Sequence, residues 1–200
     1  MSSTETGSAV PGAADDYTDL AAEIADQIQS FLVAVREIAR GENPDTTLSM
    51  LLLEVSQLGL AGGRLGAISD VVPVERFEPD AGPEPDVDEL RERIAVLLDP
   101  VDAYVEVVDP VDPARGATGF RLSDDLASIA SDLLHGMSHY RDGRVVEALW
   151  WWQFSYLSSW GSTCGAAMRA LHSLIAHTRL DHHDEAVDLL EQPLPAKVEL

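Results

Sequence analysis

Two histidines at helical spacing offer the simplest chemistry in this sequence. His135 and His139 stand four positions apart, so on one helix they would share a face and could ligate zinc or iron. Further histidines could complete such a site: His172, His177, His182 and His183. Counting at about 100° per residue, however, places the pair roughly opposite Leu126, on a polar face. The Glu-x-x-His motif of di-iron bundles does not accompany it. We therefore expect both histidines to be exposed to solvent, with no bound metal and no cofactor.

A second candidate site combines a histidine, an arginine and two carboxylates. His172 follows Arg169 by three positions and lies near the edge of an apolar stripe. It could be a half-buried histidine that is hydrogen-bonded to the backbone or to a carboxylate. Alternatively, His172 and Arg169 could meet Asp124, Asp125 or Trp160 in a polar pocket. Asp124 and Asp125 also have a simpler explanation, because acids in the first turn of a helix favour the positive end of its dipole.

The sequence offers little for covalent catalysis. Cys164 is the single cysteine, and helical counting places it on an apolar stripe, where a thiol is inert. The glycine-rich segment 59–66 lacks the Lys-Ser/Thr pair of a phosphate-binding loop. Serine-elbow, kinase and zinc-knuckle motifs are missing from the sequence. The pattern favours a protein that is not an enzyme.

All four tryptophans lie between residues 150 and 160. On a regular helix, one apolar stripe would contain Trp150, Phe154, Leu157, Cys164, Met168, Leu171 and Ile175. A separate face would carry Trp152, Tyr156 and Trp160. Two apolar faces indicate a helix packed on both sides, or a helix with one face against a ligand or partner. We interpret both faces as core, with an aromatic recognition surface on the second face as the alternative.

The elements that must position these residues are helices. Apolar spacing predicts helices over residues 18–40, 44–58, 86–97, 123–140 and 144–177, and a short last helix over 183–190. Gly41 and the Asp142-Gly143 turn should end two of them, and Ser123 is the expected N-cap of the fourth. The second helix should dissolve into the glycines at 59–66, followed by an irregular connection to Pro85. Residues 101–108 could form a short strand or a helical turn, since periodicity does not decide between them.

These elements predict an all-α fold. We expect a single domain over residues 17–190, a bundle of about five main helices with a long irregular loop. A chain of 200 residues can bury an adequate core without disulfides. Residues 1–16 are small, polar and unpatterned and should be disordered, and residues 191–200 should be flexible.

Charge is the most unusual bulk property of the chain. It has 35 Asp and Glu residues against 13 Lys and Arg residues, a formal net charge of −22. Phosphate backbones and anionic membranes repel such a chain, so direct nucleic-acid or membrane binding is disfavoured. The sequence begins without a secretory signal, and its longest apolar run, residues 48–53, is too short to span a bilayer. With a single cysteine, these features favour the cytoplasm.

Several short motifs resemble those of one bacterial family. They are Leu122-Ser123-Asp124-Asp125-Leu126, Asp132-Leu133, Gly143 with Glu147-Ala148-Leu149-Trp150, Trp152-Gln153-Phe154, Trp160-Gly161 and Ala170-Leu171-His172. Upstream, the segment from Tyr104 to Pro110 is similar as well. The family is domain of unknown function 5063, and the resemblance covers most of residues 20–177. It implies no assigned biochemical activity. It does imply a link to DNA repair or recombination, because members are often encoded beside a recombination mediator.

Three functions follow, in order of preference. The first is a non-catalytic helical module that binds an unknown protein partner through its acidic surface or its Trp152/Tyr156/Trp160 face. The second is an enzyme or small-ligand binder with a pocket lined by Trp152, Trp160, Arg169 and His172. The third is a metalloprotein centred on His135 and His139.

Overall fold

The computed structural model describes the backbone of residues 13–73, 82–107, 109, 111–112, 114 and 116–191, and side chains within 17–180 of these ranges. The predicted all-α architecture is confirmed, with one small β-hairpin added to it. The helices are α1 (Ala13–Ile38), the short 3-10 helix η1 (Pro44–Thr46), α2 (Thr47–Ala67), α3 (Asp88–Leu97), α4 (Leu122–Arg141), α5 (Val145–Ser155), the π-helical turn η3 (Tyr156–Trp160) and α6 (Gly161–Glu191). Strands β1 (Ala103–Val107) and β2 (Ala117–Arg121) pair antiparallel between α3 and α4.

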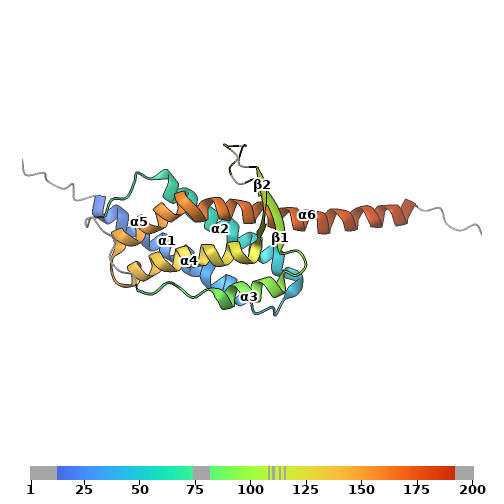
Figure 1. The fold of residues 1–200 in the computed structure, drawn as a ribbon, viewed down its shortest axis with the longest axis horizontal. Coiled ribbons are helices and arrows are strands. Elements are labelled where there is room, and N and C mark those ends of the chain that lie inside the picture. Colours follow the sequence, from blue (N-terminus) through green and yellow to red (C-terminus); the bar gives the residue numbers. More distant parts are fainter. Residues whose placement is uncertain are drawn as a thin grey trace, which may run out of the picture.

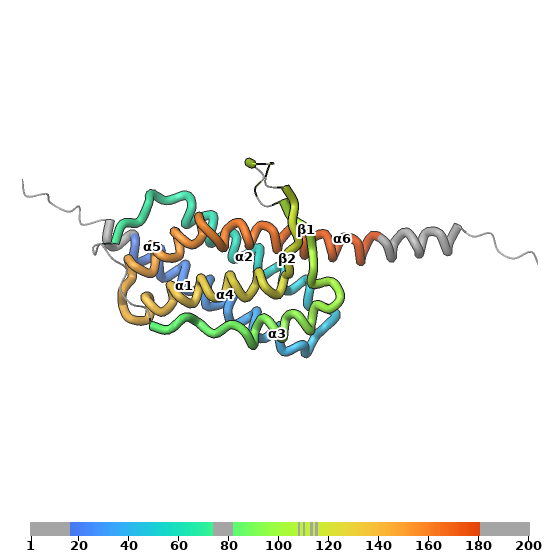
Figure 2. Tube along the Cα trace, viewed as in Figure 1, coloured from blue at the N-terminus to red at the C-terminus, as the bar shows by residue number. Residues whose placement is uncertain are grey.

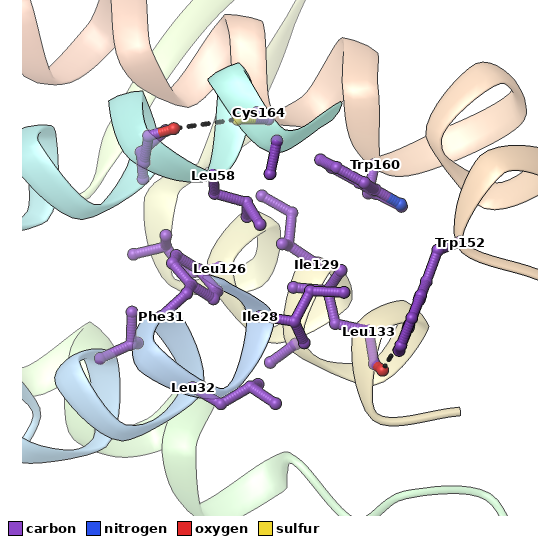
Figure 3. Packing of buried hydrophobic residues seen from close by; sticks show 14 of the residues in the cluster. Ile28, Phe31, Leu32, Leu58, Leu126, Ile129, Leu133, Trp152, Trp160 and Cys164 are labelled. Atoms are coloured by element: carbon purple, nitrogen blue, oxygen red, sulfur yellow. Dashed lines mark hydrogen bonds between the residues drawn. The ribbon is translucent and has the colours of Figure 1, made fainter. Parts of the chain in front are cut away.

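The long helices lie side by side and bury one common core. Helix α2 packs on α1 and α6, while α4 packs on α5, α3 and α6 (Figure 1). Figure 3 shows side chains from α1, α2, α4, α5, η3 and α6 meeting in the centre of this core. Labelled there are Ile28, Phe31, Leu32, Leu58, Leu126, Ile129, Leu133, Trp152, Trp160 and Cys164. Burial of these apolar groups is the main force that holds the bundle together.

Two predicted helix ends are confirmed and one is wrong. Gly41 and Gly143 adopt positive φ angles of 75° and 76° just beyond α1 and α4, a conformation that favours glycine. The second helix, by contrast, continues through the glycines at 59–66 to Ala67. A Cβ on Gly62 would lie 2.4 Å from the Tyr156 ring. The missing side chain therefore allows close packing inside a helix and does not end it.

The ends of the chain also differ from expectation. Residues 13–16, predicted to be disordered, form the first turn of α1. The separate helix expected over 183–190 is the continuation of α6, which runs unbroken to Glu191 and projects beyond the bundle (Figure 1). The remaining tail predictions, for residues 1–12 and 192–200, lie outside the described residues.

The predicted rod over residues 144–177 is helical but not a regular α-helix. The π-helical turn η3 lies in its middle, between α5 and α6. Such a turn adds one residue, which rotates every later position by about 100°. As a result, Trp152 and Trp160 align with Cys164, Ala167 and Leu171 on one buried face. Phe154 and Leu157, predicted to be core, are instead 50% and 64% exposed. The prediction of two apolar faces assumed a regular α-helix and therefore did not include this rotation.

The side-chain amide of Gln153 fastens residues 68–71 to α5. Its Nε2 donates to the carbonyls of Leu65 at 3.0 Å and Ser69 at 3.2 Å, and its Oε1 accepts from the Val71 amide at 2.7 Å. Gln153 is buried, so these bonds form away from water. The chain leaving α2 consequently lies beside α5 (Figure 2).

No helix in the described ranges combines the length and the apolarity needed to cross a bilayer.

Candidate functional site

The β-hairpin covers a hollow of about 280 Å³ on the surface of α4 and α6. We call this hollow the hairpin pocket. Tyr104, Glu106 and Val107 of β1 and Phe120 of β2 form one wall, and Asp125 of α4 forms another. The floor is the first part of α6, from Gly161 to Arg169. Two residues predicted to meet in a site, Asp125 and Arg169, therefore line the same cavity.

Asp102 fixes the hairpin to α4. Its Oδ1 accepts a hydrogen bond from the Ser123 amide at 2.8 Å, and its Oδ2 accepts from the Ser123 hydroxyl at 2.7 Å. Arg121 Nε also donates to Oδ2, at 2.8 Å. The prediction that Ser123 is the N-cap is wrong, because the helix begins at Leu122 and the cap comes from 21 residues earlier. This cap holds the end of β2, and hence the pocket wall, against α4.

Tyr104 and Asp125 form the most buried polar pair in the pocket. The Tyr104 hydroxyl donates to Asp125 Oδ2 at 2.5 Å. Asp125 is only 8% exposed, and this desolvation raises its pKa to about 6 even though the Tyr104 hydrogen bond acts to lower it. The negative charges of Asp124 and Asp102 add to the rise. Burial and the same hydrogen bond raise the pKa of Tyr104, so its hydroxyl stays protonated.

Glu106 and Arg169 form the second polar pair. Arg169 donates from Nε and Nη2 to Glu106 Oε2, at 2.8 and 2.7 Å. Desolvation acts to raise the pKa of Glu106, but hydrogen bonds from Arg169 and the Val107 amide, with the arginine charge, lower it overall. The glutamate is therefore ionised and neutralised by its partner.

The floor of the hairpin pocket is made of small residues. Gly161, Gly165 and Ala166 contribute little side chain, and a Cβ on Gly165 would meet nothing within 4 Å. Ser162 and Thr163 add hydroxyl groups at the same level. The hollow thus combines an aromatic wall, two carboxylates and one arginine, an arrangement suited to holding a small polar group.

The sequence model of one protein family, "Domain of unknown function (DUF5063)", matches residues 15–177. The chain belongs to the DUF5063 family. The crystal structure of protein BF1032 from Bacteroides fragilis, a structural-genomics target, resembles this DUF5063 chain with a TM-score of 0.57 and 19% identity, covering 94% of this chain and 98% of that one. At such identity the likeness shows the fold alone. No curated protein matches the chain.

The other residues predicted for a pocket in this DUF5063 chain do not gather there. Trp152 and Trp160 are 0% and 1% exposed and belong to the core. Tyr156 is half-buried, with its ring against Gly62 and Gly66 of α2. His172, expected at the edge of the apolar stripe, is exposed and does not line the hairpin pocket. The predicted pocket of Trp152, Trp160, Arg169 and His172 is therefore not formed.

Asp124, predicted beside Asp125, lies outside the pocket. Its carboxylate is exposed and pairs with Arg91 Nε of α3 at 3.4 Å. Neighbouring side chains on a helix point about 100° apart, so Asp124 faces α3 while Asp125 faces the hairpin pocket.

The predicted exposure of the histidine pair is wrong. His139 is fully buried, and His135 is half-buried with its ring 4.0 Å from that of Trp151. Helix α4 packs on α3, α5 and α6, so the side of α4 that is polar in sequence is covered as well. Among the described residues, no group of three or more His, Cys, Asp or Glu side chains is placed to hold a metal ion.

Sequence reasoning missed Tyr104, Glu106 and Phe120. The signal that could reveal two of them lies in residues 101–108, where a strand and a helical turn are both compatible with the sequence. In a strand, Tyr104 and Glu106 point to the same face, and Phe120 is the register partner of Tyr104. A strand over these residues therefore places an aromatic ring and a carboxylate on one face.

A second surface feature is an aromatic ridge on α5 and η3, formed by Trp150, Phe154 and Leu157. The Trp150 and Phe154 rings stack with centroids 5.5 Å apart and an interplanar angle of 12°. Phe154 also lies beside Trp151, which is half-buried. Large apolar side chains gathered on an outer helix face are typical of binding surfaces.

Proposed function

We propose that this chain is a non-catalytic protein-interaction module that binds a basic protein through the aromatic ridge. The observation that carries the proposal is the exposure of Phe154 on α5 and Leu157 on η3, with the Phe154 ring stacked on that of Trp150. Exposed aromatic and aliphatic groups release water when a partner covers them, and aromatic residues are frequent energetic centres of interfaces.

The formal net charge of −22 favours a partner that carries positive charge. A surface of this sign attracts a positively charged protein and speeds its approach, and it repels nucleic-acid phosphates. We place the interaction in the bacterial cytoplasm, in keeping with the single, buried Cys164. A link to DNA repair or recombination, which the family resemblance implies, would run through this partner and not through contact of the chain with DNA.

Site-specific photo-crosslinking in the native host tests the proposal. A benzophenone amino acid replaces Phe154 in one variant and Leu60 in the control, because Leu60 is an exposed apolar residue on α2. We expect one discrete adduct from position 154 that is missing from position 60, with a basic protein as the captured chain. Equal adducts from both positions, or a crosslinked second copy of this chain, would contradict the proposal.

The purified partner then allows a quantitative test. Phe154→Ala should weaken its binding by about tenfold or more, the effect of losing a central aromatic contact. Leu60→Ala should leave the dissociation constant unchanged. Raising the salt concentration should weaken binding to the unmodified chain, because screening reduces the attraction between opposite charges. A dissociation constant that changes with neither Phe154→Ala nor salt concentration would show that the partner does not dock on the aromatic ridge.

A further inference from the structure

We propose that the hairpin pocket binds an organic cation, a primary ammonium or a guanidinium group, against the carboxylate of Asp125. This inference concerns a different surface from the aromatic ridge and stands independently of it.

The charges around Asp125 favour the binding of a cation. Within the described part of the chain no ion pair joins Asp125 to a basic side chain, and its hydrogen bond comes from the neutral Tyr104 hydroxyl. The neighbouring Asp124 and Asp102 are negative, and their charges act on Asp125. A cation placed at this carboxylate would supply the counter-charge that the fold does not.

Three arginines, one each on α3, β2 and α6, already pair with carboxylates. Arg121 pairs with Asp102, and Arg91 pairs with Asp88 and Asp124. Arg169, the basic residue that lines the pocket, directs two nitrogens at Glu106. Because Arg169 and Glu106 cancel each other, the ionised Asp125 sets the charge of the hollow as negative. An anionic ligand would have to displace Glu106 and then lie beside Asp125.

The shape of the hairpin pocket suits an alkyl-linked cation. Tyr104 and Phe120, with ring centroids 5.8 Å apart, offer aromatic surface to a methylene chain or to the cation itself. The small floor residues leave a volume of about 280 Å³ open. The Ser162 and Thr163 hydroxyl oxygens can accept hydrogen bonds from an ammonium or guanidinium group.

Two sources share this chemistry: a free small-molecule amine, or a lysine or arginine side chain of a protein. The probes are n-butylammonium and agmatine for the first source and a blocked Lys-Arg peptide for the second. Neutral n-pentanol and anionic butyrate are the matched controls. Binding is followed by carbon-detected NMR of the side-chain carboxyl carbons in the full chain.

We expect at least one cationic probe to shift the Asp125 carboxyl signal in a saturable manner, with no saturable shift from pentanol or butyrate. Affinity should fall about tenfold from pH 7 to pH 5, because a carboxyl with a pKa of about 6 loses most of its charge over that interval. Tighter binding of the small amines indicates a metabolite site, and tighter binding of the peptide indicates a protein side chain. Failure of all cationic probes, or an equal response to pentanol, would overturn the proposal.

Variants separate this site from its surroundings. Asp125→Asn, followed at the Glu106 carboxyl signal of the same pocket, should abolish saturable binding. Asp124→Asn, next in sequence but outside the pocket, should change the affinity by less than about twofold. Arg169→Gln frees Glu106 and should strengthen cation binding, while a gain of butyrate binding in any of these proteins would reverse the assigned charge.

Two further readouts keep the test independent of folding and of the ridge. In the unsubstituted protein, saturating cation should lower the pKa of Asp125, so the proposal does not depend on Asp125→Asn being well folded. A constant Asp125 pKa with bound cation would place the ligand elsewhere. Phe154→Ala should leave cation binding unchanged, so failure of the proposed partner interaction and failure of the cation site are distinguishable.

Discussion

The Tyr104 hydroxyl donates a 2.5 Å hydrogen bond to Asp125 Oδ2 and thereby joins strand β1 to helix α4. Despite this bond, desolvation raises the pKa of Asp125 to about 6, above the usual value of about 3.9 for an unfolded chain. The protonated form is therefore favoured in the folded state. Its stabilising contribution is fully present below about pH 4 and is lost as the pH rises through about 6.

Asp125→Asn should remove this pH dependence. The full shift corresponds to about 3 kcal/mol, and solvent screening reduces it to about 1–2 kcal/mol. We expect the difference in free energy of unfolding, wild type minus Asp125→Asn, to decrease by that amount between pH 4 and pH 7. Urea denaturation of both proteins at several pH values measures it. A difference that stays constant over this range would refute the raised pKa.

Adjacent glycines of α2 should respond in opposite ways to alanine. A Cβ on Gly62 would lie 2.4 Å from the Tyr156 ring and 2.7 Å from that of Trp160, so Gly62→Ala should destabilise the protein by about 1–3 kcal/mol. A Cβ on Gly63 meets nothing within 4 Å, and Gly63→Ala should stabilise by about 0.5–1 kcal/mol through better helix propensity. Thermal unfolding compares the two variants, and shifts of the same sign would show that α2 does not pack on η3 as described.

These glycines also illustrate what sequence could and could not predict. Features encoded within one helical turn were predicted correctly: a first helix over residues 18–40, from its apolar spacing, and the glycines that follow α1 and α4. The role of Gly62 depends on a ring some 94 residues later, which spacing alone does not reveal. The π turn at Tyr156–Trp160 likewise has no local sequence signal, yet it changes which residues of the rod are buried.

The candidate site was predicted only in part for a similar reason. Asp125 and Arg169 were predicted as possible members of one polar pocket with His172, and these two residues do line one pocket. Tyr104 and Glu106 join them through the pairing of β1 with β2, a non-local contact. His172, one position after the buried Leu171, is exposed, because successive side chains of a helix point about 100° apart.

Gln153 should be important for stability out of proportion to its size. Gln153→Leu removes hydrogen bonds to Leu65, Ser69 and Val71 and leaves buried backbone groups without partners. We expect a loss of about 2–4 kcal/mol in the free energy of unfolding. Exchange of the Val71 amide hydrogen should accelerate, since its acceptor is lost. Phe154→Ala, one position further on but half exposed, is the control and should cost less than about 1 kcal/mol. Similar costs for both variants would show that these hydrogen bonds contribute little.

The helix cap supplied by Asp102 should stabilise the protein more than an acidic residue in the first turn of α4 does. Asp102→Ala removes acceptors from the Ser123 amide, the Ser123 hydroxyl and Arg121, so we expect a loss of about 2–4 kcal/mol. Asp124→Ala removes only an exposed carboxylate near the helix N-terminus and should cost about 0.3–1 kcal/mol. Urea denaturation ranks the two. Equal costs would mean that Asp102 does not anchor the hairpin to α4.

Cys164 should be unreactive as long as the chain is folded. Its thiol is buried, with Sγ donating to the Val55 carbonyl at 3.4 Å (Figure 3), and desolvation raises its pKa to about 11. The thiolate is the reacting species, so at pH 8 the raised pKa alone should slow modification about a hundredfold relative to an ordinary cysteine, and burial slows it further. An aromatic disulfide reagent should therefore modify the native protein over hours and the urea-unfolded protein within minutes. Prompt modification of the native protein would mean that α2 and α6 separate readily, in conflict with the shared core that these two helices form around Trp160.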